Sequence, residues 1–216
     1  MLGPVPRRLG RTLQVGEGGV CTQRRKLLGL PRFVLPLVLF CLLGLVVWPG
    51  PASTATRAAD GPISFTPIAD TYASEASPAK NYAGHVALKL RKATDGGSYR
   101  SYIRFRVTGL TRPVSSAKLR LYATDPFSSS GGSVYRSDES WQESTLTWSN
   151  APALVGAPLA SVGPVSAGTW VELDLKSAIT GDGTYSFALQ NSNADGAFYS
   201  SREGGHAPEL VITQSG

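Results

Sequence analysis

The sequence predicts an all-β fold, a jelly-roll β-sandwich preceded by a secretory leader. The main observation is an alternation of apolar and polar residues, clearest where Ile103, Phe105 and Val107 alternate with basic and aromatic residues. A period of two with β-branched and aromatic side chains indicates a half-buried strand. Turn-forming stretches such as 95–97 and 181–183 separate these segments. About ten short strands at this spacing are typical of a sandwich, with a jelly roll as the expected form.

Residues 1–57 are predicted to be a leader outside the fold. A basic flank at 24–32 precedes an apolar run of 16 residues, 33–48, and small residues follow. This is the order of a signal peptide, with Ser53-Thr54-Ala55 as its cleavage site. The run is shorter than the roughly 20 residues that a spanning helix needs. An uncleaved membrane anchor is the alternative, and in either case 58–216 would be an exported domain.

Four predicted strands carry the alternation most clearly, at 85–92, 99–107, 117–124 and 170–175. The other expected strands are shorter runs between turns. One helical turn is expected at Lys176–Thr180, after a possible cap at Asp174. In chain order, the predicted strands are Ile63–Phe65, Asp70–Ser74, His85–Lys92, Tyr99–Val107, Ala117–Thr124, Ser133–Arg136, Leu146–Trp148, Trp170–Leu175, Tyr185–Gln190, Phe198–Ser201 and Glu209–Thr213.

Composition excludes several kinds of chemistry from the exported part. Both cysteines, Cys21 and Cys41, lie in the leader. Disulfides, thiolate catalysis and cysteine-ligated metals are therefore excluded, and the core must provide the stability. Seven of the 21 basic residues and one of the 15 acidic residues precede Thr56, so the remainder is close to neutral. The basic pI thus gives no argument for nucleic-acid binding.

Charge is unevenly distributed along the exported part. Nine cations and one acid lie between Val86 and Leu121, whereas ten acids and three cations follow from Tyr122 onward. The simpler, structural interpretation is that basic strands pair with acidic strands across the sheet. The sharper hypothesis is that the outward residues of 86–92, 99–107 and 117–124 share one open face. An arginine fork can grip a carboxylate through two hydrogen bonds, so this face would suit an acidic polysaccharide.

Aromatic side chains complete the predicted ligand-binding face. Tyr102 and Tyr122 are preferred to Tyr82 and Tyr99, because alternation places them outward beside Arg104 and Arg120. Trp148 and Trp170 are expected in the core, whereas Trp141 is expected to be exposed. The predicted ligand-binding residues are Lys89, Arg91, Tyr102, Arg104, Arg106, Lys118, Arg120, Tyr122 and Trp141.

Two pairs of acids are candidates for a structural calcium ion, Asp70 with Glu203 and Glu172 with Asp174. Calcium takes six to eight oxygen ligands, and spacing alone does not show that these acids converge. The alternative is that they are solvated or paired with cations. We expect no other cofactor.

Catalysis has little support in the sequence. The exported part has two histidines, His85 and His206, in no recognisable triad pattern, and it lacks a Gly-x-Ser-x-Gly nucleophile motif. Tyr102, Arg104 and His85 could imitate the constellation of a polysaccharide lyase. We expect a protein that is not an enzyme, with a lyase as the weakest hypothesis.

Ordered blocks cover nearly all of the exported part, among them Ala69–Tyr72, Arg100–Phe105, Trp141–Trp148 and Tyr199–Gly204. They resemble the DNRLRE-type domain, also classed as carbohydrate-binding module family 96. The chain departs from the family pattern at Ala83, where a glycine often follows the Asn-Tyr pair. The resemblance implies a secreted or cell-surface bacterial binding module whose relatives bind acidic polysaccharides of the alginate type.

These observations together predict a secreted, monomeric, non-catalytic carbohydrate-binding module for an acidic, uronate-type polysaccharide. A structural or adhesive surface domain without glycan specificity is the second hypothesis. Membrane contact is expected only if the leader stays uncleaved.

Overall fold

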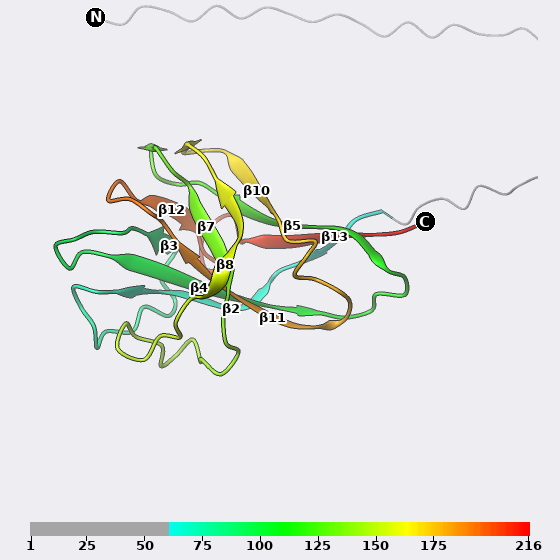
Figure 1. Ribbon diagram of the computed structural model, residues 1–216, viewed down its shortest axis with the longest axis horizontal. Helices are drawn as coiled ribbons and strands as arrows, with labels where there is room; N and C mark the ends of the chain where they lie inside the picture. Colours follow the sequence, from blue (N-terminus) through cyan, green and yellow to red (C-terminus); the bar gives the residue numbers. More distant parts are fainter. Residues whose placement is uncertain (1–60) are drawn as a thin grey trace, which may run out of the picture. The chain divides into compact units, whose positions relative to one another are not determined.

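The computed structural model describes residues 61–216, and this part consists of β-strands and the loops between them (Figure 1). The prediction of an all-β sandwich is therefore confirmed. The predicted leader lies outside the described residues, so its cleavage stays a prediction. Residues 61–216 contain no helix that is long and apolar enough to cross a membrane.

The described residues form two main antiparallel sheets. One has four strands in the order β1-β13-β5-β10, and the other has five in the order β2-β4-β11-β7-β8. Two small sheets pair β12 with β3 and β6 with β9. The strands are β1 (Ile63–Phe65), β2 (Pro67–Ser74), β3 (Ala87–Leu90), β4 (Tyr99–Val107), β5 (Val114–Tyr122), β6 (Phe127–Ser128), β7 (Gly132–Arg136), β8 (Val155–Val162), β9 (Val165–Ser166), β10 (Trp170–Asp174), β11 (Gly183–Gln190), β12 (Ala197–Ser200) and β13 (Glu209–Gln214).

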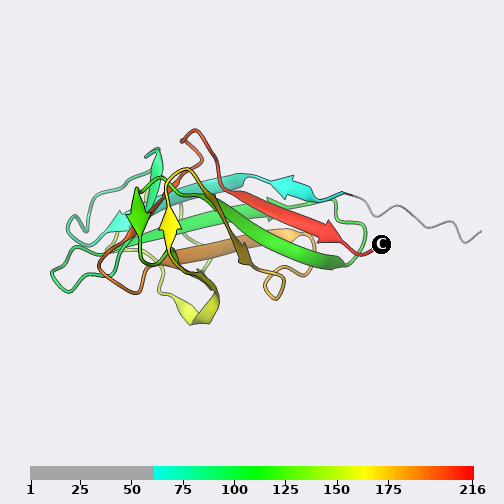
Figure 2. The same cartoon turned by 90° about the horizontal axis from the view of Figure 1, so that it is seen from above.

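The main core lies between the two sheets. Strand β4 contributes Ile103 and Phe105, and β5 contributes Leu119 and Leu121, all at most 1% exposed. In Figure 2, β5 and β13 of the four-stranded sheet run side by side. Full burial of each such side chain contributes about 1.5–3 kcal/mol. This core can therefore stabilise a fold that has no cysteine after residue 41.

A second core covers the outer face of the five-stranded sheet. Loop 137–154 packs Trp141 and Leu146 against Tyr102 of β4 and Ala188 of β11. The Asn81 amide fixes this loop, since its Nδ2 donates to the carbonyl oxygens of Glu143 and Leu146, both at 2.7 Å. The loop is the yellow-green segment below β2 and β4 in Figure 1. It closes this part of the sheet face to solvent.

The observed strands differ most from the predicted strands at the edges of the sheets. The strand predicted at Leu146–Trp148 is wrong, because this segment belongs to the loop of the second core. Strands β6, β8 and β9 were not expected; β8 is largely exposed and contains Gly156 and Pro158, so it lacks the apolar alternation. The helical turn expected at Lys176–Thr180 is a hydrogen-bonded turn, with Lys176 N donating to Asp174 Oδ1 at 2.8 Å.

The close approach of Gly131 to its neighbours gives a stability prediction. A Cβ there would lie 2.2 Å from Cγ1 of Val162 and 2.6 Å from the hydroxyl oxygen of Tyr199. We expect Gly131→Ala to lower the free energy of unfolding by about 1–3 kcal/mol, because overpacking displaces buried neighbours. Gly163→Ala is the matched control, since a Cβ there meets nothing within 4 Å. Chemical denaturation measures both, and equal stabilities would contradict the prediction.

Candidate functional site

The basic strands β4 and β5 lie in different sheets, with their apolar residues facing the common core. Arg104 and Arg106 therefore project from the outer face of the five-stranded sheet, while Lys118 and Arg120 project from the opposite side of the sandwich. The prediction that all the basic strands share one binding face is wrong. Alternation identifies outward positions correctly, but it does not show which strands are neighbours.

Cations on the four-stranded sheet are paired with acids of the adjacent strands. Lys118 Nζ lies 2.7 Å from Glu172 Oε2, and Arg120 Nη1 lies 2.5 Å from Glu209 Oε2. Arg120 Nε is also 3.4 Å from Glu172 Oε1. The hydrogen bond from Lys118 lowers the pKa of the Glu172 carboxyl. Exposed pairs of this kind contribute about 0–1 kcal/mol each. On this face, cations and acids of adjacent strands thus neutralise each other, as the structural interpretation of the charge distribution predicts.

Three rings lie beside these ion pairs. Tyr122 stacks on His206 with 3.8 Å between ring centroids, and it meets Trp170 edge-on at 5.4 Å. The Arg120 guanidinium lies 4.7 Å from the Trp170 ring. Trp170 shares the outward side of β10 with Glu172, so the expectation that it packs in the core is wrong.

Two predicted ligand residues are buried where loop 137–154 packs on the five-stranded sheet. Tyr102 is 0% exposed, and its hydroxyl donates to the carbonyl oxygen of Pro152 at 2.6 Å. Trp141 is 5% exposed, and its Nε1 donates to Ser186 Oγ at 2.8 Å. The predictions that Tyr102 faces solvent and that Trp141 is exposed are wrong, because the loop folds back onto the sheet.

Arg104 of β4 also fixes this loop. Its guanidinium lies 4.3 Å from the Trp141 ring, and Nη2 donates to the carbonyl oxygen of Trp141. The side chain is half-buried and engaged within the protein. A shallow hollow of about 320 Å³ opens nearby in the same loop, lined by residues that include Ser140, Gln142 and Asn150.

A different group of aromatic residues surrounds Lys89 on β3. Its ammonium nitrogen lies 5.2 Å from the Tyr72 ring, 5.3 Å from Phe198 and 5.7 Å from Tyr99. Each such contact contributes about 0.5–1 kcal/mol when exposed. Lys89 takes part in no ion pair among residues 61–216. Three rings thus hold an ammonium group that has no acidic partner in the described part of the chain.

The same ring cluster extends over the loop before β3. Tyr82 stacks on Tyr72 at 4.2 Å, and His85 meets Tyr72 edge-on at 5.1 Å. Lys80 Nζ lies 4.9 Å from the Tyr82 ring. Tyr72 is buried beneath the others, which are half-buried. We name this group the aromatic–lysine surface; its members are Tyr72, Tyr82, His85, Lys89, Tyr99 and Phe198.

Two further predicted cations, Arg91 and Arg106, lie apart from the ion pairs of the four-stranded sheet. Arg91 is half-buried, and its Nε donates to the carbonyl oxygen of Ala194 at 3.0 Å. Arg106 is exposed near the end of β4 opposite to Tyr99. Tyr99 and Arg106 are seven positions apart on β4, which corresponds to about 23 Å along a strand. Arg106 therefore does not join the aromatic–lysine surface.

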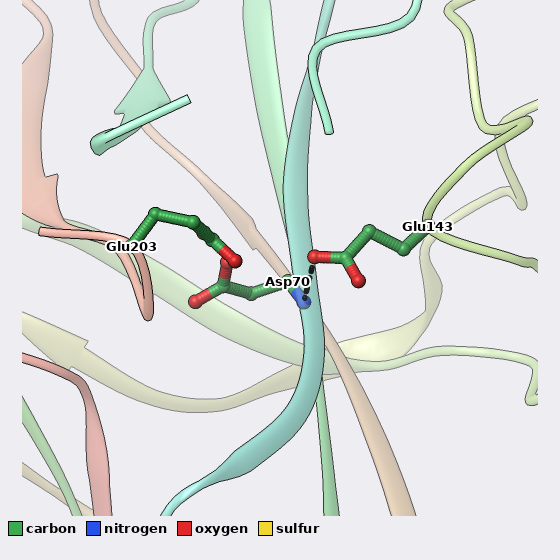
Figure 3. Close-up of side chains that lie close together, drawn as sticks. All are labelled: Asp70, Glu143 and Glu203. Atoms are coloured by element: carbon green, nitrogen blue, oxygen red, sulfur yellow. Dashed lines mark hydrogen bonds between the residues drawn. The ribbon is translucent and has the colours of Figure 1, made fainter. Parts of the chain in front are cut away.

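Acidic side chains gather at the edge of β2. Asp70, Glu143 and Glu203 each place one carboxylate oxygen within 4.8 Å of the others (Figure 3). Burial raises the pKa of the Asp70 carboxyl to about 7, against the lowering effect of a hydrogen bond from the Arg202 backbone. The predicted pairing of Asp70 with Glu203 is thus close in space, with Glu143 as an additional member. Of the other predicted pair, Glu172 pairs with the Lys118 ammonium group and Asp174 accepts a hydrogen bond from the backbone N–H of Lys176.

The fold and these surfaces define a β-sandwich binding module. A family model for carbohydrate-binding module family 96 matches residues 62–214, and the chain belongs to this family. The resemblance found in the sequence is confirmed, and the chain is a carbohydrate-binding module. A search of curated proteins gives no match.

Sequence reasoning missed most of the aromatic–lysine surface. Tyr99 has the same parity on β4 as the core residue Ile103, so alternation favours an inward position for it. It lies at the first residue of β4, beside β3 rather than under the other main sheet. Tyr72 on β2 and Phe198 on β12 belong to strands whose partners, β4 and β3, are distant in sequence. Of this surface, the sequence predicted Lys89 as a ligand contact, and beyond it only the aromatic character of Tyr82 and Tyr99 gave a signal.

Proposed function

We propose that this carbohydrate-binding module recognises an acidic, uronate-type polysaccharide and that the aromatic–lysine surface contacts the ligand. The observation that carries the proposal is Lys89, an ammonium group held among three rings with no acidic partner in residues 61–216. A uronate residue supplies a carboxylate for the ammonium group and an apolar sugar face for the rings. Charge-assisted hydrogen bonds of this kind are stronger than neutral ones.

The other basic residues support this choice of surface. Lys118 and Arg120 already contact carboxylates, so a sugar acid would have to compete with Glu172 and Glu209. Arg104 is occupied by the Trp141 ring and carbonyl. Lys89 and the neighbouring Lys80 are the cations that lie against aromatic rings without such a competitor among the described residues.

Lys89→Met tests the proposal, with Lys118→Met as the matched control. Methionine keeps an apolar stem among the rings and removes the charge. We expect Lys89→Met to weaken polyuronate binding at least tenfold, or about 1.4 kcal/mol. Lys118→Met should bind as the unmodified protein does. Affinity gel electrophoresis with alginate and titration calorimetry measure the effect.

Salt and neutral polymers provide the test of ligand class. Binding should weaken as salt rises, because at about 0.15 M the screening length is only ~8 Å. A neutral glucan lacks carboxylates and should bind poorly. Equal binding of alginate and glucan would refute uronate specificity. Loss of binding in Lys118→Met alone would move the ligand to the four-stranded sheet.

The second candidate is a structural or adhesive domain without glycan specificity. It is favoured by the ion pairs of Lys118 and Arg120, whose charges are neutralised inside the protein. In that case no polysaccharide in a glycan array should retain the protein at low salt. Selective retention of polyuronates would exclude it.

We also propose that the module is not an enzyme. In the constellation that could imitate a lyase, the Tyr102 hydroxyl is bonded to Pro152 and Arg104 is bonded to Trp141. His85 Nδ1 accepts a hydrogen bond from the backbone of Ala87 at 3.1 Å. Incubation with alginate should therefore release no unsaturated ends absorbing in the ultraviolet. Turnover that disappears in His85→Ala would contradict this expectation.

Export is the remaining part of the proposal, and it is supported by the leader pattern before Thr56. We expect a secreted or surface-located monomer with a processed N-terminus near this residue. N-terminal sequencing of the exported protein and gel filtration are the measurements. An intact Met1 in the membrane fraction would indicate the anchored form instead.

A further inference from the structure

Three carboxyl groups from separate segments of the chain meet at the edge of β2. Asp70 lies on β2, Glu143 on loop 137–154, and Glu203 on the loop between β12 and β13. Figure 3 shows Glu143 and Glu203 approaching Asp70 from opposite sides of the strand. Asp70 is 1% exposed whereas Glu203 is exposed, so the group extends from the interior to the surface.

One oxygen in this group is buried and has no hydrogen-bond partner among residues 61–216. Asp70 Oδ2 accepts a hydrogen bond from Arg202 N at 2.8 Å, whereas Asp70 Oδ1 accepts none from the described part of the chain. The Asp70 backbone N–H donates to Glu143 Oε1 at 3.2 Å. Buried carboxylate oxygens in native proteins are normally hydrogen-bonded or coordinated to a cation, because desolvation without a partner costs free energy.

The charge of the group in its ionised form also favours a bound cation. Arg202 pairs with two of the acids, through Nη2 to Glu143 at 2.8 Å and Nε to Glu203 at 3.0 Å. Three ionised carboxylates against one guanidinium leave a charge of about −2, which a divalent ion neutralises.

We propose that Asp70, Glu143 and Glu203 bind a calcium ion that fastens loop 137–154 and the β12–β13 loop to β2. Calcium binds oxygen ligands at about 2.3–2.6 Å, so two oxygens on opposite sides of the ion are about 4.8 Å apart. The separation of the three oxygens, at most 4.8 Å, therefore suits this ion. Water can complete the coordination at the exposed Glu203 side.

The ligand set distinguishes calcium from other metals. Magnesium requires a near-ideal octahedron and dehydrates reluctantly, whereas calcium accepts irregular geometry from independent loops. Zinc and copper prefer histidine or cysteine, and this cluster has carboxylates only. The inference concerns a structural ion and does not depend on which polysaccharide is bound.

Calorimetric titration of the chelator-treated, full-length protein with calcium chloride tests the proposal. We expect one ion per chain and a melting temperature that rises with calcium. Asp70→Asn and Glu203→Gln each remove a ligand charge and should weaken calcium binding at least ~10-fold. Glu139→Gln is the matched control, because Glu139 is an exposed acid of the same loop. It should bind calcium as the unmodified protein does.

Stability measurements separate a cation site from a closed network of ion pairs. Asp70→Asn removes a buried charge, so in chelator it should melt no lower than the unmodified protein, and calcium should not raise its melting temperature. If Asp70→Asn fails to fold, the melting temperature of Glu203→Gln, which changes an exposed side chain, provides the same test. The proposal is overturned if no calcium binds up to roughly 10 mM. It is also overturned if both variants bind calcium with unchanged affinity.

Discussion

Replacing Trp141 by alanine is expected to lower the free energy of unfolding by about 3–5 kcal/mol, the usual cost of removing a large buried aromatic side chain. Trp141 is 5% exposed and packs with Tyr102 and Leu146 in the second core. The variant also loses the hydrogen bond from Nε1 to Ser186 and the ring beneath the Arg104 guanidinium. Loop 137–154 should then detach from the sheet.

Denaturant unfolding with two companion variants checks this expectation. Trp141→Phe keeps most of the ring volume and loses the Nε1 hydrogen bond, so it should cost about 1–2 kcal/mol. Gln142→Ala, at the exposed neighbouring position, should stay within about 0.5 kcal/mol of the unmodified protein. A Trp141→Ala protein of unchanged stability would mean that the loop is not packed. The Tyr102 face would then be open to a ligand, as the sequence alone suggests.

The strands of the sandwich could be predicted where alternation is strong. Strand β4 has the predicted bounds, Tyr99–Val107, and β10 has the predicted start at Trp170. These strands face a core on one side, and a period of two follows directly from strand geometry. Strand β8 lies at an edge and is mostly exposed, so its sequence is not selected for an apolar face. That is why its pattern gave no signal.

The binding face could not be predicted from the same alternation. Pairings such as Glu172 with Arg120 and Glu209 with Arg120 join residues far apart in the chain, and they decide which charges are already neutralised. A loop that folds back over a sheet also converts an outward position into a buried one, as at Tyr102. The alternation of residues along one strand shows neither which strands pair nor which loop covers them. The acidic pair Asp70 and Glu203 was suggested by residue type, but Glu143 was found only in three dimensions.

Arg104→Glu is expected to lower the free energy of unfolding by about 2–4 kcal/mol while leaving polyuronate binding at the aromatic–lysine surface intact. The change removes a cation over the Trp141 ring and the donor to its carbonyl oxygen, and it places a carboxylate beside that oxygen. Arg106→Glu is the matched control, because Arg106 is exposed two residues further along β4 and should change stability by less than about 0.5 kcal/mol. Thermal melts and alginate titrations of both variants are the measurements. If Arg104→Glu instead abolished alginate binding and melted normally, Arg104 would be a ligand contact, and the binding face would lie on the five-stranded sheet.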